Sequence, residues 1–205
     1  EILVPVSGEE KGWRALEQAL LIAEREGGEV HGIYIAPNAT DTDIHALQAE
    51  FESRCQRLAI GGILHIHAGG TIAEVIREHG HWNDLMVLRL AHPPGSLPID
   101  RLRSGFSHLI RTSSRPILAV PGEVSTLSRP LLAYDGSRKA REALFVATYM
   151  VGCWQLPLTV VAVSDGRRSK VLAEARDYLE SQGIQAEFVE LQKRNQTVGS
   201  HILHT

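Results

Sequence analysis

An internal repeat constrains the fold of this chain more than any other feature of its sequence. Residues 1–37 align without gaps with residues 129–165, at a constant shift of 128 positions. Identical residues coincide at Leu3 and Leu131, Gly8 and Gly136, Lys11 and Lys139, Ala15-Leu16 and Ala143-Leu144, and Ala19 and Ala147. Self-similarity at a fixed shift indicates two diverged copies of one structural unit.

The repeat divides the 205 residues into two predicted domains, a number that the length allows at roughly 100–200 residues per domain. The segment 121–129 between the copies is rich in Ser, Pro and Gly, which is typical of a linker. We therefore predict a first domain over residues 1–122 and a second domain over residues 123–205.

Short apolar runs alternate with segments of helical periodicity within the first copy. The runs predict strands over residues 2–6, 30–36, 63–67, 85–90 and 116–120, and the apolar spacing between them predicts helices. Strict alternation of strand and helix predicts an α/β fold with a doubly wound parallel sheet. In such sheets ligands bind beyond the carboxyl ends of the strands, near the point where the strand order reverses.

The second copy repeats this alternation over fewer elements. It predicts strands over residues 131–134, 158–163 and 186–191, with helices over residues 137–151 and 170–182. At the shift of 128, a fourth strand would begin near position 212. We therefore expect the second doubly wound domain to be incomplete.

The motif that follows the first strand of each copy resembles the universal stress protein family, in particular its tandem-domain members. It reads Leu131-Leu132-Ala133-Tyr134-Asp135-Gly136-Ser137 in the second copy and Ile2-Leu3-Val4-Pro5-Val6-Ser7-Gly8 in the first. Further resemblance lies in Asp84-Leu85-Met86-Val87 and in Arg115-Pro116-Ile117-Leu118-Ala119-Val120. The resemblance implies five parallel strands in the order 3-2-1-4-5 and a stress-response binding or signalling module.

The resemblance also implies a candidate ATP site, since many family members bind this nucleotide. An acidic residue after the first strand contacts the nucleoside, and the backbone beside it contacts the adenine. In the second copy the acidic residue is Asp135, and the implied contacts are Ala133, Tyr134, Asp135, Gly136 and Val163. A turn or helix-cap role for Asp135 in Asp-Gly-Ser is the alternative interpretation.

In the first copy the same site looks degraded. Its implied contacts are Pro5, Val6, Ser7, Ile35 and Ser104. Ser7 replaces the acidic residue, and Ser7-x-x-Glu10 also has the form of a capping box at a helix start. We therefore expect the second copy to bind ATP better than the first.

The family's phosphate loop, G-x2-G-x9-G-(S/T), follows the fourth strand and aligns with the first copy in two ways. Spacing alone matches Gly95 and Gly105, whereas the flanking residues match Ser104 to the final Ser/Thr. The second alignment fits better and places Arg89 and Arg103 where the family has glycines. Glycines let backbone amides approach phosphate oxygens, so the arginines and three nearby prolines, Pro93, Pro94 and Pro98, weaken this site.

Ten histidines raise the question of a metal site. His65 and His67 are two residues apart on a predicted strand and share one face, while His79 and His81 close the following helix. A nine-residue helix rises about 13 Å, which places His79 toward the opposite edge of the sheet from His67. We therefore expect no metal site.

Composition excludes other classes of function. The formal net charge of −3 argues against nucleic-acid binding, and no apolar run approaches the roughly 18 residues that span a bilayer. Two cysteines, Cys55 and Cys153, indicate reduced thiols and a cytoplasmic location, with Cys55 on the apolar face of a predicted helix.

No motif indicates a dedicated catalyst, so we expect a non-enzymatic module. Two alternatives stay open: a nucleotide-free structural or interaction protein of the same fold, and a weak ATPase. The resemblance also implies self-association through the fifth strand, residues 116–120. Its unpaired edge would face the second copy or another chain, giving a pseudo-dimer or a homodimer.

Overall fold

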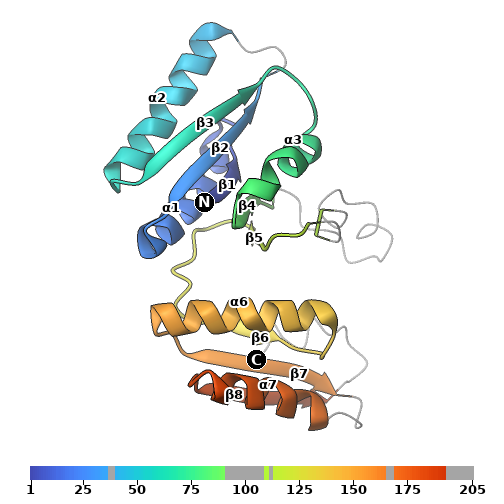
Figure 1. The fold of residues 1–205 in the computed structure, drawn as a ribbon. Helices are drawn as coiled ribbons and strands as arrows, with labels where there is room; N and C mark the ends of the chain where they lie inside the picture. The colour runs from blue at the N-terminus through green and yellow to red at the C-terminus, as the bar shows by residue number, and fades with distance from the viewer. Residues whose placement is uncertain (37–39, 91–108, 111–112, 165–168, 193–205) are drawn as a thin grey trace. The chain divides into compact units, whose positions relative to one another are not determined.

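The computed structural model describes residues 1–36, 40–90, 109–110, 113–164 and 169–192. The chain separates into two compact units, Glu1–Thr126 and Leu127–Thr205 (Figure 1). Among the described residues, no helix combines the length and the apolar character needed to cross a membrane.

The first unit contains one parallel sheet of five strands in the order β3-β2-β1-β4-β5 (Figure 1). The strands are β1 (Ile2–Pro5), β2 (Glu29–Ile35), β3 (Gly61–His67), β4 (Leu85–Arg89) and β5 (Ile117–Val120). This confirms the predicted α/β class and the predicted strand order. The order reverses between β1 and β4, so the crevice typical of doubly wound sheets lies at the carboxyl ends of these two strands.

Helices cover both faces of this sheet. They are η1 (Glu10–Gly12), α1 (Trp13–Glu26), α2 (Asp41–Arg57), α3 (Ile72–His79) and η2 (Gly80–Trp82). Right-handed crossovers place α1 and α2 on one face and α3 on the other (Figure 1). Leu3, Ile33, Met86 and Leu88 form the core beneath α3 together with residues of the helix itself.

Capping boxes start two of these helices. In α2 the Thr40 hydroxyl accepts from the Asp43 amide while the Asp43 carboxylate accepts from the Thr40 amide, and Thr71 and Glu74 repeat this in α3. Hydrogen bonds from these threonines lower the pKa of Asp43 and of Glu74.

Cys55 of α2 packs against the sheet close to Gly62, where a Cβ atom would collide with its sulfur. The thiol is buried, as the apolar face of the helix predicted, and burial raises its pKa. Both cysteines are free, and Cys153 is exposed.

The second unit contains three parallel strands in the order β6-β7-β8. Its elements are β6 (Leu131–Ala133), α6 (Arg138–Trp154), β7 (Leu158–Ser164), α7 (Ser169–Ser181) and β8 (Ala186–Gln192). The described strands therefore follow the predicted arrangement through the third strand. The core between helices and sheet is formed by residues that include Leu144, Leu158, Val160 and Leu179, all almost fully buried.

The backbones of the two units are alike at positions that the repeat aligns. Gly8 and Gly136, which the repeat aligns, have φ angles of +74° and +73°. The equivalent helices α1 and α6 end at aligned positions, each followed by a left-handed C-cap residue, Gly27 in one and Gln155 in the other. Glycine adopts this conformation readily, whereas Gln155 adopts it at a cost.

The alignment shifts once, in the second helix of each copy. Val30 of β2 pairs with Gly62, whereas its counterpart Leu158 of β7 pairs with Ala186, so the shift falls from 128 to 124. The helix α7 has 13 residues and α2 has 17. Four residues are about one helical turn, so the same apolar face can still meet the sheet.

Candidate functional site

The residues predicted for the nucleotide site of the second unit gather at the carboxyl end of β6. Ala133 ends the strand opposite Val161 of β7, and Val163 lies two residues further along β7, level with the turn that begins at Asp135. The turn is held by two bonds: the Tyr134 amide donates to the Val161 carbonyl, and the Ser137 amide donates to Asp135 Oδ1, at 2.8 and 2.9 Å.

Asp135 therefore has a turn role, which the sequence analysis gave as the alternative to nucleoside contact. The helix cap is Ser137, whose hydroxyl accepts from the Ala140 amide at the start of α6. The Asp135 side chain is exposed at this sheet edge. Because the positive φ of Gly136 turns the chain sharply, the carboxylate stands beside the amino end of a helix, where negative charge is stabilised.

Tyr134 belongs to the core of the second unit, next to this turn. Only 2 % of its surface is exposed, and its hydroxyl has no close hydrogen-bond partner among the described residues. A bidentate ion pair between Arg141 and Glu174 lies close by, with an Nε–Oε1 distance of 2.7 Å. Burial, and then the charge of Glu174, raises the pKa of Tyr134, so the phenol stays neutral.

In the first unit the corresponding positions are Pro5, Val6, Ser7 and Ile35. The Val6 amide donates to the Ile33 carbonyl at 2.8 Å, as its counterpart Tyr134 does to Val161. The predicted Ser7 capping box is wrong. The helical segment begins with Glu9 as N-cap, and no side chain caps it, because the Ser7 side chain lies against Gly12.

Charged side chains occupy the neighbouring edge, at the carboxyl ends of β4 and β5. Arg89 Nη1 lies 3.7 Å from Glu9 Oε2, and Arg14 Nη1 lies 3.5 Å from Glu123 Oε2. A surface pocket here is lined by both arginines together with Glu10 and Glu123. Ser104 and Arg103, predicted for the phosphate loop, lie outside the described residues.

Four histidine rings lie in a row between the sheet and α3, and we call them the histidine row. They are His31 of β2, His65 and His67 of β3, and His79 of α3. Ring centroids are 5.4 Å apart for His31 and His65, 5.1 Å for His65 and His79, and 5.1 Å for His67 and His79.

The expected separation of His79 from His67 is therefore wrong. The helical rise locates the backbone of His79, but side chains on a helix lean toward its amino terminus. This leaning carries the His79 ring back toward the carboxyl end of β3. Burial, followed by the charges of His79, His31 and His67, lowers the pKa of His65.

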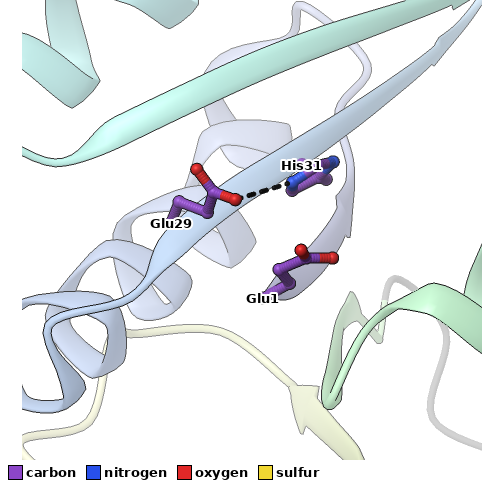
Figure 2. Close-up of side chains that lie close together, drawn as sticks. All are labelled: Glu1, Glu29 and His31. Carbon is purple, nitrogen blue, oxygen red and sulfur yellow. Dashed lines mark ion pairs between the residues drawn. The ribbon is translucent and has the colours of Figure 1, made fainter.

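Two carboxylates extend the histidine row at the amino end of the sheet. The register pairs Ile2 with Val30, so Glu1, the residue before β1, lies beside Glu29 on the face of β2 that also carries His31. One ligand atom from each lies within 4.8 Å of the others, and His31 Nε2 is 3.6 Å from Glu29 Oε1. Figure 2 shows the Glu29 carboxylate directed at the His31 ring, with Glu1 beside them.

The sequence pattern did not predict this group, because Glu1 and His31 are 30 residues apart in the chain. The signal was present in Glu29-x-His31-x-Ile33, since residues two apart on a strand share a face. The register of β1 and β3 against β2, which brings these side chains together, cannot be read from the sequence.

Comparison with known proteins identifies the fold. No protein-family model matches the chain, and no curated protein matches it. A universal stress protein from Archaeoglobus fulgidus DSM 4304 covers 94 % of this chain and 77 % of its own length, with 18 % identity and a TM-score of 0.70. A functionally unknown protein from Pseudomonas aeruginosa PAO1 covers 92 % of this chain and 73 % of its own, with 16 % identity and a TM-score of 0.60.

A universal stress protein in complex with cAMP covers 60 % of this chain at 19 % identity. Its TM-score of 0.46 is too low to place a nucleotide in this chain. The chain therefore has the universal stress protein fold, as the sequence motifs implied.

Proposed function

We propose that the chain is a stress-response binding module that holds an adenine nucleotide at the carboxyl end of β6, in the second unit. The observation that carries the proposal is the exposed Asp135 carboxylate on a hydrogen-bonded turn at the ligand-binding edge of a doubly wound sheet. A carboxylate offers about four acceptor positions and accepts more strongly from a hydroxyl than a neutral side chain does, so it suits a ribose.

The surroundings of Asp135 suit a nucleoside. Ala133 and Gly136 have small or absent side chains, so a base can approach the backbone at the end of β6. Val163 adds an apolar surface at the end of β7. Tyr134, buried and neutral, supports the turn from below without adding charge.

The first unit is proposed not to hold the nucleotide. Its equivalent of Asp135 is Ser7, a weaker acceptor than a carboxylate, packed against Gly12. Arg89 and Arg14, which would otherwise attract phosphate, are paired with Glu9 and Glu123. Glutamates at this edge also repel an anionic ligand.

Calorimetric titration of ATP and of AMP into the full chain tests the proposal. Asp135→Asn keeps an oxygen that can accept from Ser137 but removes the charge, so the turn should persist. We expect this variant to lose about 10–150-fold in affinity, the worth of one hydrogen bond to a charged group. Ser7→Ala, the equivalent change in the first unit, is the matched control and should bind as the wild type does.

Equal affinity in wild type and Asp135→Asn would contradict the assignment of this residue. If the wild type binds neither nucleotide, the proposed function fails and the nucleotide-free interaction protein is favoured. Phosphate release measured in the same samples tests the weak ATPase alternative.

We also propose that the protein self-associates through β5. This strand is one edge of the first sheet, since it pairs with β4 on one side only among the described residues. The Pro116 and Val120 carbonyls accept from β4, so the backbone groups of Ile117 and Ala119, the alternate residues, face outward. Such outward groups can pair with another strand.

A further inference from the structure

We propose that Glu1, Glu29 and His31 bind one divalent transition-metal ion at the amino end of the first sheet. The site lies at the end of β1 and β2 opposite to their carboxyl edge, so it is independent of the proposed nucleotide function. Two of its ligand residues lie on β2 and the third directly precedes β1, and the three ligand atoms lie within 4.8 Å of one another.

The donor atoms suit such an ion. Imidazole nitrogen and carboxylate oxygen bind zinc at about 2.0–2.2 Å, which puts neighbouring ligands roughly 3.3 Å apart in a tetrahedral site. His31 is fixed by the sheet, whereas both glutamates are exposed and can rotate over the remaining distance. A single imidazole with two carboxylates leaves room for water as a further ligand.

The His31 ring is oriented as a metal-binding imidazole usually is. Its Nδ1 lies 3.2 Å from His65 Nε2, while its Nε2 is buried and has no hydrogen-bond partner in the part of the chain that the structure describes. If His31 Nδ1 carries the proton and donates it to His65, the lone pair of His31 Nε2 points toward the carboxylates. Metal-bound histidines characteristically donate their other N–H to a fixed acceptor of this kind.

The histidine row keeps His65 suitable for this role. His65 must be neutral to accept a proton from His31. It is half-buried and has His31 and His79 as ring neighbours, so a charge on it would be poorly solvated and would repel its neighbours. His65 is thus a positioning residue, and it does not need to touch the ion.

Charge also favours a cation at this position. The Glu1 and Glu29 carboxylates face each other across β1 and β2, and neither pairs with a lysine or arginine among the residues that the structure describes. A divalent ion neutralises both. The simpler alternative is that a protonated His31 neutralises them in part, with no metal bound.

The experiment titrates Zn²⁺ into the full chain by calorimetry and follows Co²⁺ by its visible absorption, which reports four-coordinate binding. We expect one ion per chain. Glu29→Gln and Glu1→Gln remove exposed carboxylates without disturbing the sheet, and we expect each to weaken binding at least 10-fold. His31→Gln should abolish it.

His65→Phe tests the positioning role. It keeps a ring in the row but removes the acceptor, and we expect a 10–100-fold loss of affinity. His45→Ala removes an exposed histidine of α2 and is the matched control, with no expected change.

Absence of one-to-one binding to the wild type would overturn the proposal and favour the protonated His31. Equal affinity in wild type, Glu29→Gln and Glu1→Gln would also overturn it, since the ion would then lie elsewhere. Neither result depends on ATP binding at Asp135.

Discussion

The side chain of Gln18 attaches the segment after β5 to helix α1, and the loss of this attachment should destabilise the first unit by a predictable amount. The Gln18 side chain is buried in α1, with 2 % of its surface exposed. Its Nε2 donates to the Ser125 carbonyl at 3.1 Å, and its Oε1 accepts from the Ser125 amide at 2.7 Å. One side chain thus holds both backbone groups of a residue more than 100 positions away.

Gln18→Leu keeps most of the packing volume and removes both bonds. Each bond contributes about 1 kcal/mol net, which gives about 2 kcal/mol for the pair. Ser125 is exposed, so its freed groups can bind water and the larger penalty for a buried unsatisfied group does not apply. We expect Gln18→Leu to lower the free energy of unfolding of the first unit by about 1–2 kcal/mol.

The assay must report the first unit alone. Trp13 is 5 % exposed in α1, whereas Trp82 is 79 % exposed. With Trp82 and Trp154 replaced by Phe, Trp13 fluorescence during urea unfolding follows the first unit. The control is Val146→Ala at the aligned position of α6, which should change stability by less than about 0.5 kcal/mol. A Gln18→Leu midpoint equal to that of the parent chain would refute the reasoning.

Three further predictions concern protonation, assembly and thiol reactivity. The lowered pKa of His65 means that the folded state binds fewer protons than the unfolded state, so stability should fall as the pH drops from 7.5 through the unfolded value of about 6.5. His65→Phe should flatten this slope in urea titrations, and an unchanged slope would contradict the assignment. Ala119→Pro removes an outward amide of β5, so light scattering should detect a smaller assembly than for the wild type, and an unchanged mass would count against pairing through this edge. A maleimide should label the exposed Cys153 quickly and the buried Cys55 at least 10-fold more slowly, and equal rates in Cys55→Ala and Cys153→Ala variants would contradict the burial of Cys55.

The sequence by itself determined the fold class, and its self-similarity predicted two units. Strands that alternate with helices form a parallel sheet covered by helices. Because crossover connections between parallel strands are almost always right-handed, few strand topologies remain possible. The alignment of Gly8 with Gly136 is visible in the sequence because both positions require a left-handed backbone. The turn at Asp135 was also predictable, since its Asp-Gly-Ser motif is local and follows a strand.

The tertiary structure alone decided the features that depend on register and on side-chain direction. The start of η1 differed from its local pattern: Ser7 packs against Gly12, and Glu9 is the N-cap. The His79 ring reaches His65 and His67 because helical side chains lean back toward the amino terminus of the helix. The spacing of residues along the sequence does not show this direction. Glu1 and His31 are 30 residues apart in the chain, and only the pairing of β1 with β2 brings them together. The periodicity of the sequence shows which face of a strand or helix a residue occupies. The pairing of strands in the folded sheet decides which residues on that face become neighbours.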